Sequence, residues 1–176
     1  MGVERGKLVA VQGLGGLGHL AVQFSRAMGY RTVAISRGED KRSMAMSLGA
    51  VEHIDSQKED VNFRLQVMGG AALTVATAPS PEAVGQLLHT LQVRGKLLVL
   101  TPIGPIPLDS VSMVNKALSV HGWPSGHVVD KVEVLEFMRV SRVKCLIEKM
   151  SLADVDKVLN EVREGKPRFK KVLVMT

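Results

Sequence analysis

The sequence is poor in aromatic side chains and contains a single cysteine. Phe, Trp and Tyr make up 3% of its 176 residues, so an aliphatic core of Val, Leu, Ile, Ala and Met is expected. The lone Cys145 excludes an internal disulfide framework and a cysteine-cluster metal site. The fold must therefore be stabilised by the packing of aliphatic side chains rather than by covalent or metal cross-links.

Long apolar runs and compositional bias are missing as well. No apolar stretch reaches the roughly 18 residues that a transmembrane helix needs, so no membrane partner is expected. Apolar residues at 45% and charged residues at 23% indicate a globular chain and exclude a disordered one. The N-terminus shows no apolar signal region, and we expect a cytoplasmic protein.

The excess of positive charge is modest, with a net charge of +6. A nucleic-acid surface needs clustered basic residues, preferably with interleaved aromatics. The basic residues here are scattered, apart from Lys166, Arg168, Lys170 and Lys171. A nucleic-acid or anion-binding protein is therefore the weakest of the functional hypotheses, and we expect no nucleic-acid partner.

Short apolar runs rich in β-branched residues alternate with helical patterns. Such runs are typical of buried parallel strands, and the alternation predicts an α/β fold with a parallel sheet and right-handed crossovers. The expected strands are Leu8–Gln12, Thr32–Ser36, Val51–Ile54, Leu73–Ala76, Lys96–Leu100, Leu118–His121 and Lys171–Met175.

Three helices are indicated by apolar side chains that recur at steps of three and four residues. The first follows Gly16, and the second begins with a Ser80 N-cap ahead of Pro81. The third is expected between a capping box at Ser151, with aspartate in place of glutamate, and a closing glycine, Gly165.

A glycine-rich loop lies between the first strand and the first helix. Gly13, Gly15 and Gly18 fit the dinucleotide-binding pattern G-x-G-x-x-G in the strand–turn–helix context that the pattern requires. The first glycine permits the tight turn, the second admits a pyrophosphate, and the third lets helix and strand pack closely. Backbone N–H groups near Gly16 and Leu17 would then face the anion, assisted by the helix dipole.

The end of the second strand bears on the choice of cofactor. NAD sites usually place a carboxylate there to hold the ribose 2′-hydroxyl. This strand instead ends in Ser36 and Arg37, with Lys41 close by, a set that suits a 2′-phosphate. Glu39 and Asp40 leave NAD as the alternative, and a solvated charged turn without a ligand is the other. The sequence favours NADP.

No catalytic residue and no metal ligand can be assigned. The five histidines form no metal-binding pair at helical spacing. His19, in the first turn after the glycine loop, is expected either to approach the cofactor or to lie on the helix surface. Cys145 has no obvious base beside it and is interpreted as a buried or half-buried thiol.

Taken together, five segments resemble the medium-chain, zinc-containing alcohol dehydrogenases, with the NADP-dependent, cinnamyl-alcohol-dehydrogenase-like branch as the nearest. The segments are Val11–His19, Ile35–Gly38, Leu48–Ala50, Gly95–Leu97 and Gly165–Lys170. The resemblance covers essentially the whole chain and corresponds to the family's cofactor-binding half. It implies a doubly wound, six-stranded parallel Rossmann sheet with helices on both faces, over residues 1–176.

The resemblance also implies contacts along the cofactor. Ser36, Arg37 and Lys41 match positions that hold the adenosine 2′-phosphate. Beyond that end, the implied contacts are Thr77 and Ala78 at the adenosine ribose, Thr101, Pro102 and Ile103 at the nicotinamide ribose, Trp123 and Ser125 beside the nicotinamide, and Lys170 near the pyrophosphate.

The departure from the family pattern concerns zinc, whereas the expected assembly follows the family. The family's zinc ligands and substrate pocket come mainly from an N-terminal domain that we expect to be absent here. The chain alone should then bind NADP(H) without acting on the alcohol or aldehyde substrate of an intact enzyme. The alternative is a stand-alone dinucleotide-binding or regulatory module. The family pairs its Rossmann domains edge to edge, which implies a homodimer through Ile106–His121.

Overall fold

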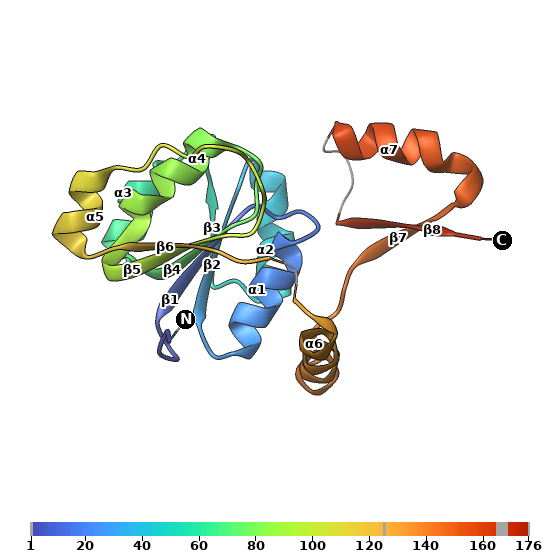
Figure 1. Cartoon of the computed structure of the whole chain (residues 1–176), viewed down its shortest axis with the longest axis horizontal. Helices are drawn as coiled ribbons and strands as arrows, with labels where there is room; N and C mark the ends of the chain where they lie inside the picture. Colours follow the sequence, from blue (N-terminus) through green and yellow to red (C-terminus); the bar gives the residue numbers. More distant parts are fainter. Residues whose placement is uncertain (1, 125, 165–168, 176) are drawn as a thin grey trace.

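A six-stranded parallel sheet forms the centre of the molecule (Figure 1). The computed structural model describes residues 2–124, 126–164 and 169–175. Its strand order is β3-β2-β1-β4-β5-β6, which reverses direction between β1 and β4. The strands are β1 (Leu8–Gln12), β2 (Arg31–Ser36), β3 (Glu52–Asp55), β4 (Ala71–Ala76), β5 (Leu91–Val99) and β6 (Ser119–Gly122).

Alternating side chains of each central strand enter two hydrophobic layers. In β1, Leu8 and Ala10 belong to one buried cluster, whereas Val9 and Val11 belong to the other. A strand that is buried on both faces in this way needs an unbroken apolar run, because successive side chains point to opposite sides. The predicted α/β fold with a doubly wound, six-stranded parallel sheet is confirmed.

Helices cover both faces of the sheet, as predicted. The helices α1 (Gly18–Ala27) and α2 (Arg42–Leu48) contribute buried side chains to the layer that contains Val9. The opposite layer receives side chains from α3 (Val61–Val67), α4 (Pro81–Gln86) and α5 (Ser110–Lys116). Two short 3-10 helices, η1 (Glu39–Lys41) and η2 (Leu87–Thr90), complete this part. We call β1–β6 with α1–α5 the sheet body.

Local signals around α4 and β5 are reproduced in part. Ser80 caps α4 by accepting a hydrogen bond from the backbone N–H of Ala83 at 3.4 Å, as predicted. The strand β5 begins at Leu91 rather than at Lys96. Its early part is irregular, because Arg94 adopts a φ of 59° and the register against β4 shifts. The first half of β5 was not predicted, because an irregular strand does not show the regular pattern of apolar residues on which the prediction depends.

The chain beyond the sheet body forms a second, smaller unit (Figure 1). It consists of α6 (Val128–Ser141), β7 (Ile147–Ser151), the 3-10 helix η3 (Leu152–Asp154), α7 (Val155–Arg163) and β8 (Lys170–Val174). The strands β7 and β8 pair in parallel in a sheet of their own. We call residues 128–174 the C-terminal segment. No helix in the described ranges is both long and apolar enough to cross a bilayer.

Two expectations for the C-terminal segment are wrong, and one strand of it was not expected. The strand predicted at Lys171–Met175 forms at Lys170–Val174, but it pairs with β7 and is half exposed instead of joining the buried sheet. The strand β7 was not expected, because its charged sequence lacks a β-branched apolar run. Ser151 caps η3 through the N–H of Ala153 instead of forming a capping box with Asp154. Gly165, expected to close α7, lies outside the described residues.

Candidate functional site

The glycine-rich loop joins β1 to α1 where two backbones approach very closely. A Cβ atom at Gly18 would lie 1.8 Å from the carbonyl oxygen of Gly13, so only glycine fits there. Gly13 has a φ of 96°, and a Cβ on it would lie 2.6 Å from the Thr77 hydroxyl oxygen. At Gly15, by contrast, no described atom lies within 4 Å of the Cβ position. Gly13 and Gly18 are therefore packed against neighbouring atoms of the protein, whereas there is free space beside Gly15.

A large cavity begins at this loop. Its volume is about 1020 Å³, and it lies at the carboxyl ends of β1, β2 and β4. This is the point where the strand order reverses, which is the usual ligand-binding place in open α/β sheets. The predicted residues that line it are Gly13, Gly15, Ser36, Arg37, Lys41 and Ala78.

Positive charge lies on the cavity wall at the end of β2. Arg37 and Lys41 are exposed and line the cavity together with the nearly buried Ser36. Glu39, one of the two carboxylates that left NAD open, is ion-paired with Arg42, whose hydrogen bond holds the pKa of Glu39 below its usual value. The other carboxylate, Asp40, lines the cavity.

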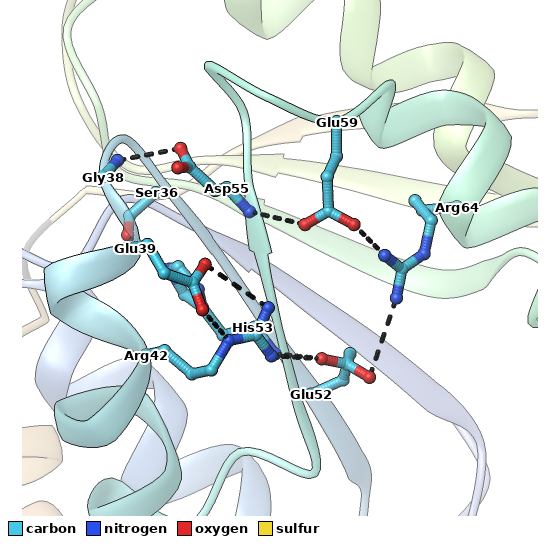
Figure 2. A network of polar contacts seen from close by, with 9 residues as sticks. All are labelled: Ser36, Gly38, Glu39, Arg42, Glu52, His53, Asp55, Glu59 and Arg64. Atoms are coloured by element: carbon cyan, nitrogen blue, oxygen red, sulfur yellow. Dashed lines mark hydrogen bonds and ion pairs between the residues drawn. The ribbon is translucent and has the colours of Figure 1, made fainter.

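A network of polar side chains surrounds the turn after β2 and the neighbouring strand β3 (Figure 2). The guanidinium of Arg42 donates to Glu39 and, at 2.8 Å, to Glu52 on β3. Glu52 in turn lies 3.7 Å from Arg64, which also pairs with Glu59. These ion pairs connect η1, α2, β3 and α3, and they fix the elements on which the charged end of the cavity is built.

Two buried residues of β3 reach the turn after β2. The carboxylate of Asp55 accepts the backbone N–H of Gly38 at 2.8 Å, which lowers the pKa of Asp55 and fixes the turn that carries Arg37. The imidazole Nε2 of His53 lies 2.8 Å from the Ser36 hydroxyl oxygen, and both side chains are buried. The sequence analysis assigned neither His53 nor Asp55 to the site.

His19 occupies neither of the positions expected from the sequence, because it is completely buried and does not line the cavity. Its Nε2 accepts the backbone N–H of Leu146 at 3.1 Å, so the proton lies on Nδ1, which donates to the Gly15 carbonyl at 3.0 Å. Burial lowers the pKa of His19 and so favours this neutral form. His19 therefore connects the glycine loop to the C-terminal segment.

Phe169 completes the cavity wall from the far end of the chain. Its ring lies 4.5 Å from the His19 ring, between centroids, and it lines the same cavity as Gly13 and Gly15. Its backbone has a φ of 81°, which is rare for a bulky residue and marks local strain. A contact across this sequence distance has no local signal, which explains why sequence reasoning missed it.

A second, smaller cavity of about 480 Å³ follows the ends of β5 and β6. Thr101, Pro102, Ile103 and Trp123 line it, so four residues expected near the nicotinamide lie together. Thr77, expected at the adenosine ribose, lines neither cavity and donates its hydroxyl to the carbonyl of Gln12 at 2.8 Å. The Thr101 hydroxyl donates to the carbonyl of Thr77 at 3.2 Å.

The remaining predicted residues do not line the large cavity or lie outside the described residues. Gly16 lies against β8, since a Cβ there would be 3.4 Å from Cγ of Lys170, so Lys170 does lie beside the glycine loop. Leu17 is 45% exposed and, like Gly16, Gly18 and Lys170, does not line the large cavity. Ser125 lies outside the described residues.

The sequence analysis missed several lining residues, among them Met44, Asn62, Gln86 and Leu87. They come from α2, α3, α4 and η2, and only the packing of these elements places them at one cavity. None follows a strand directly or belongs to a motif, so no signal in the sequence marks them.

The described residues do not fit a zinc ion. No group of three or more His, Cys, Asp and Glu side chains with metal-binding geometry occurs among them. Cys145 is exposed, contrary to the expectation of a buried or half-buried thiol. The described part of the chain therefore offers no zinc ligand set of its own.

The glycine loop, the reversal of strand order and the cavity define a nucleotide-binding type of α/β domain, and comparison with known proteins gives its family. Residues 16–139 match the family model "Zinc-binding dehydrogenase". The chain is 43% identical over 175 residues to the alcohol dehydrogenase patD of Penicillium expansum, covering 99% of this chain and 52% of that protein. The chain belongs to the zinc-binding dehydrogenase family and corresponds to its C-terminal, cofactor-binding domain.

Solved structures agree with this assignment. A cinnamyl alcohol dehydrogenase from Sorghum bicolor superimposes with a TM-score of 0.86 at 28% identity, over 97% of this chain and 48% of that one. The alcohol dehydrogenase from Aeropyrum pernix superimposes with a TM-score of 0.90 at 23% identity, over 98% and 51%, and supports the fold. The chain spans about half the length of the curated relatives that it matches.

Proposed function

We propose that this chain binds NADP(H) as the cofactor-binding part of an alcohol dehydrogenase. In the intact enzyme, hydride would pass between the nicotinamide and a small alcohol or aldehyde. The relatives named as alcohol dehydrogenases and cinnamyl alcohol dehydrogenases support the reaction class. In the intact enzyme, the half that this chain does not match would supply the substrate pocket and the zinc, as the family resemblance implies. The cytoplasmic location expected from the sequence stays a prediction.

One observation carries the proposal: the glycine loop and the Ser36–Arg37–Lys41 group line the same cavity. The open side of Gly15 gives a pyrophosphate room beside the N-terminus of α1, where the helix dipole favours an anion. Arg37 and Lys41 then offer a fork-shaped cation and a point charge to a 2′-phosphate. Thr101, Pro102, Ile103 and Trp123 line the second cavity, where the nicotinamide end would lie.

Replacement of Arg37 by Ala tests the preference for NADP. Hydrogen bonds to charged groups contribute about 1.5–3 kcal/mol, so Arg37→Ala should weaken NADPH binding by roughly 10- to 100-fold. NADH binding should change little, because NADH lacks the 2′-phosphate. Isothermal titration calorimetry with both cofactors measures the two dissociation constants.

Arg31→Ala is the matched control, because Arg31 is exposed at the opposite end of the same strand. It should leave both dissociation constants unchanged. Equal losses for NADPH and NADH in Arg37→Ala would show that Arg37 does not contact the 2′-phosphate. If the unaltered chain binds neither cofactor, the proposed function as a whole is wrong.

We also propose that the chain forms a homodimer through the edge that includes Ile106–His121. The strand β6 is the last in the sheet order and pairs only with β5 among the described strands. On α5, which precedes β6 in the chain, Val111 and Val114 are 66% and 80% exposed. An unpaired edge next to exposed apolar side chains favours association.

Light scattering after size-exclusion chromatography tests the dimer. The unaltered chain should run as a dimer, and Val114→Glu should shift it to the monomer by placing a charge in the apolar contact. Val51→Glu is the control, because Val51 is 52% exposed and directly precedes β3, the strand at the opposite edge of the sheet. A monomeric unaltered chain at high concentration would contradict the proposal.

A further inference from the structure

A buried histidine lies directly behind the serine at the charged end of the cavity. Ser36 is the last residue of β2, it is 7% exposed, and it lines the cavity. His53, on the neighbouring strand β3, is fully buried, and its Nε2 lies 2.8 Å from the Ser36 oxygen. The histidine cannot reach a ligand itself, so any effect on binding must act through the serine.

The environment of His53 determines which ring nitrogen carries the proton. Burial lowers the pKa of His53, which favours the neutral ring, and the nearby Arg42 acts in the same direction against Glu39, Asp55 and Glu52. The buried Nδ1 has no hydrogen-bond partner in the described part of the chain. A buried N–H without an acceptor is rarer than a buried lone pair without a donor. The proton therefore lies on Nε2, which donates to Ser36.

The direction of that bond settles what Ser36 can offer a ligand. A serine hydroxyl has one proton and two lone pairs. With one lone pair occupied by the His53 N–H, the Ser36 proton is free to point into the cavity. In the other tautomer, Ser36 would donate its only proton to His53 and would face the ligand as an acceptor.

We propose that His53 is a positioning residue that commits the Ser36 hydroxyl to donate to the 2′-phosphate of NADP(H). A phosphate oxygen only accepts hydrogen bonds, so it gains fully from a committed donor. A ribose 2′-hydroxyl usually donates its proton to an acceptor on the protein. Ser36 is a poorer acceptor for it, because one of its two lone pairs is occupied by the His53 N–H. His53 thus contributes to the preference for a phosphorylated ribose without touching it. This inference rests on the proposed NADP binding.

The test uses 2′,5′-ADP and 5′-ADP, which differ in the 2′-phosphate and contain no nicotinamide. Calorimetry on the whole chain gives the ratio of the two dissociation constants. His53→Met should lower the preference for 2′,5′-ADP by roughly fivefold, a part of the value of one charged hydrogen bond. His53→Gln should restore much of it, because the glutamine amide can donate from the place of Nε2.

Combination with Ser36→Ala separates positioning from a general structural effect. In the Ser36→Ala background, His53→Met should leave the ligand ratio unchanged, because the group through which His53 acts has been removed. Thr32→Val is the stability control: it removes a buried 2.8 Å hydrogen bond to Ser25 at the other end of β2. It should lower the melting temperature without changing the ratio.

Nitrogen NMR of the unaltered chain with 2′,5′-ADP bound keeps the inference testable even where a variant does not fold. We expect His53 to be neutral with its proton on Nε2, and a proton on Nδ1 instead would overturn the proposal. An unchanged ligand ratio in His53→Met, or the same change with and without Ser36, would also overturn it. Failure of the unaltered chain to prefer 2′,5′-ADP would instead refute the proposed NADP preference, and this inference with it.

Discussion

The sheet body and the C-terminal segment differ in how they bury apolar side chains. In the sheet body, side chains such as Leu88, Leu91 and Leu97 are completely buried between the sheet and its helices. In α6, which the structure describes in full, no residue is buried, and Val128, Leu135 and Val140 are each more than 60% exposed. The sheet body thus has a core of its own, whereas α6 presents an apolar surface to its surroundings.

The C-terminal segment is held to the body at a few defined points. Phe137 on α6 stacks on Phe24 of α1 with ring centroids 5.6 Å apart. The side-chain amide of Gln23 donates to the carbonyl of Lys144 at 2.9 Å and accepts its N–H at the same distance. A regular helix therefore does not imply a buried one: α6 is helical over its whole length but has few of the packing contacts that normally stabilise a helix.

The largest expected difference between the two regions concerns core leucines. Leu97→Ala, in the fully buried centre of β5, should lower the free energy of unfolding by about 2–5 kcal/mol. Leu135→Ala on α6, where the side chain is 66% exposed, should change it by about 0.5 kcal/mol or less. Urea denaturation of both variants measures the difference. Equal losses would mean that α6 is buried in solution, for example against a second copy of the chain.

A smaller and local effect is expected from the ion pairs of the C-terminal segment. The Lys171 ammonium on β8 lies 2.8 Å from Glu148 and 2.7 Å from Glu161, and these contacts raise the pKa of Lys171. Lys171→Met should speed amide hydrogen exchange in β7 and β8 while leaving β1 to β5 unchanged. Lys7→Met in the sheet body is the control, because its single ion pair with Glu4 is exposed. Faster exchange throughout the chain would show that the two regions unfold together.

The smallest expected effect concerns the pH dependence of stability. His19 contributes to it, because this buried histidine connects the sheet body to the C-terminal segment. An unfolded histidine takes up a proton below a pKa of about 6.5, whereas the folded His19 stays neutral because burial lowers its pKa. Stability should therefore be full above pH 6.5 and fall as the pH decreases below it. His19→Phe should reduce this dependence in thermal unfolding between neutral and mildly acidic pH, and the part that remains is expected from His53, whose pKa is also lowered by burial. A slope of unchanged size in His19→Phe would exclude His19 as a source.

The sheet body could be predicted from the sequence because each of its signals is local. The apolar run Leu8–Gln12, the glycines after it and the Ser80 cap act within a few residues, and the structure confirms the elements that they predict. The placement of Ser36 and Arg37 at the cavity could also be predicted, because they follow β2 and the carboxyl ends of parallel strands lie at the same edge of a sheet.

The parts that escaped prediction depend on contacts between distant residues. β7 is a charged strand whose partner, β8, follows α7, and nothing in its own sequence indicates pairing. The burial of His19 and His53 results from packing by other elements, and their hydrogen bonds to Leu146 and Ser36 span long sequence distances. A histidine in a helix or strand looks the same in the sequence whether it is exposed or buried.

The position of Phe169 has a consequence for how the cavity is made during synthesis. Gly13 and Gly15 line the cavity from the loop after β1, whereas the ring of Phe169, which lines the same cavity, is synthesised more than 150 residues later. A nascent chain that has completed β1 to β6 thus has the sheet and the glycine loop but lacks one wall of the cavity. Tight cofactor retention would then begin only after residue 169 has been translated, so a prematurely terminated chain would fold its sheet and yet hold its nucleotide poorly.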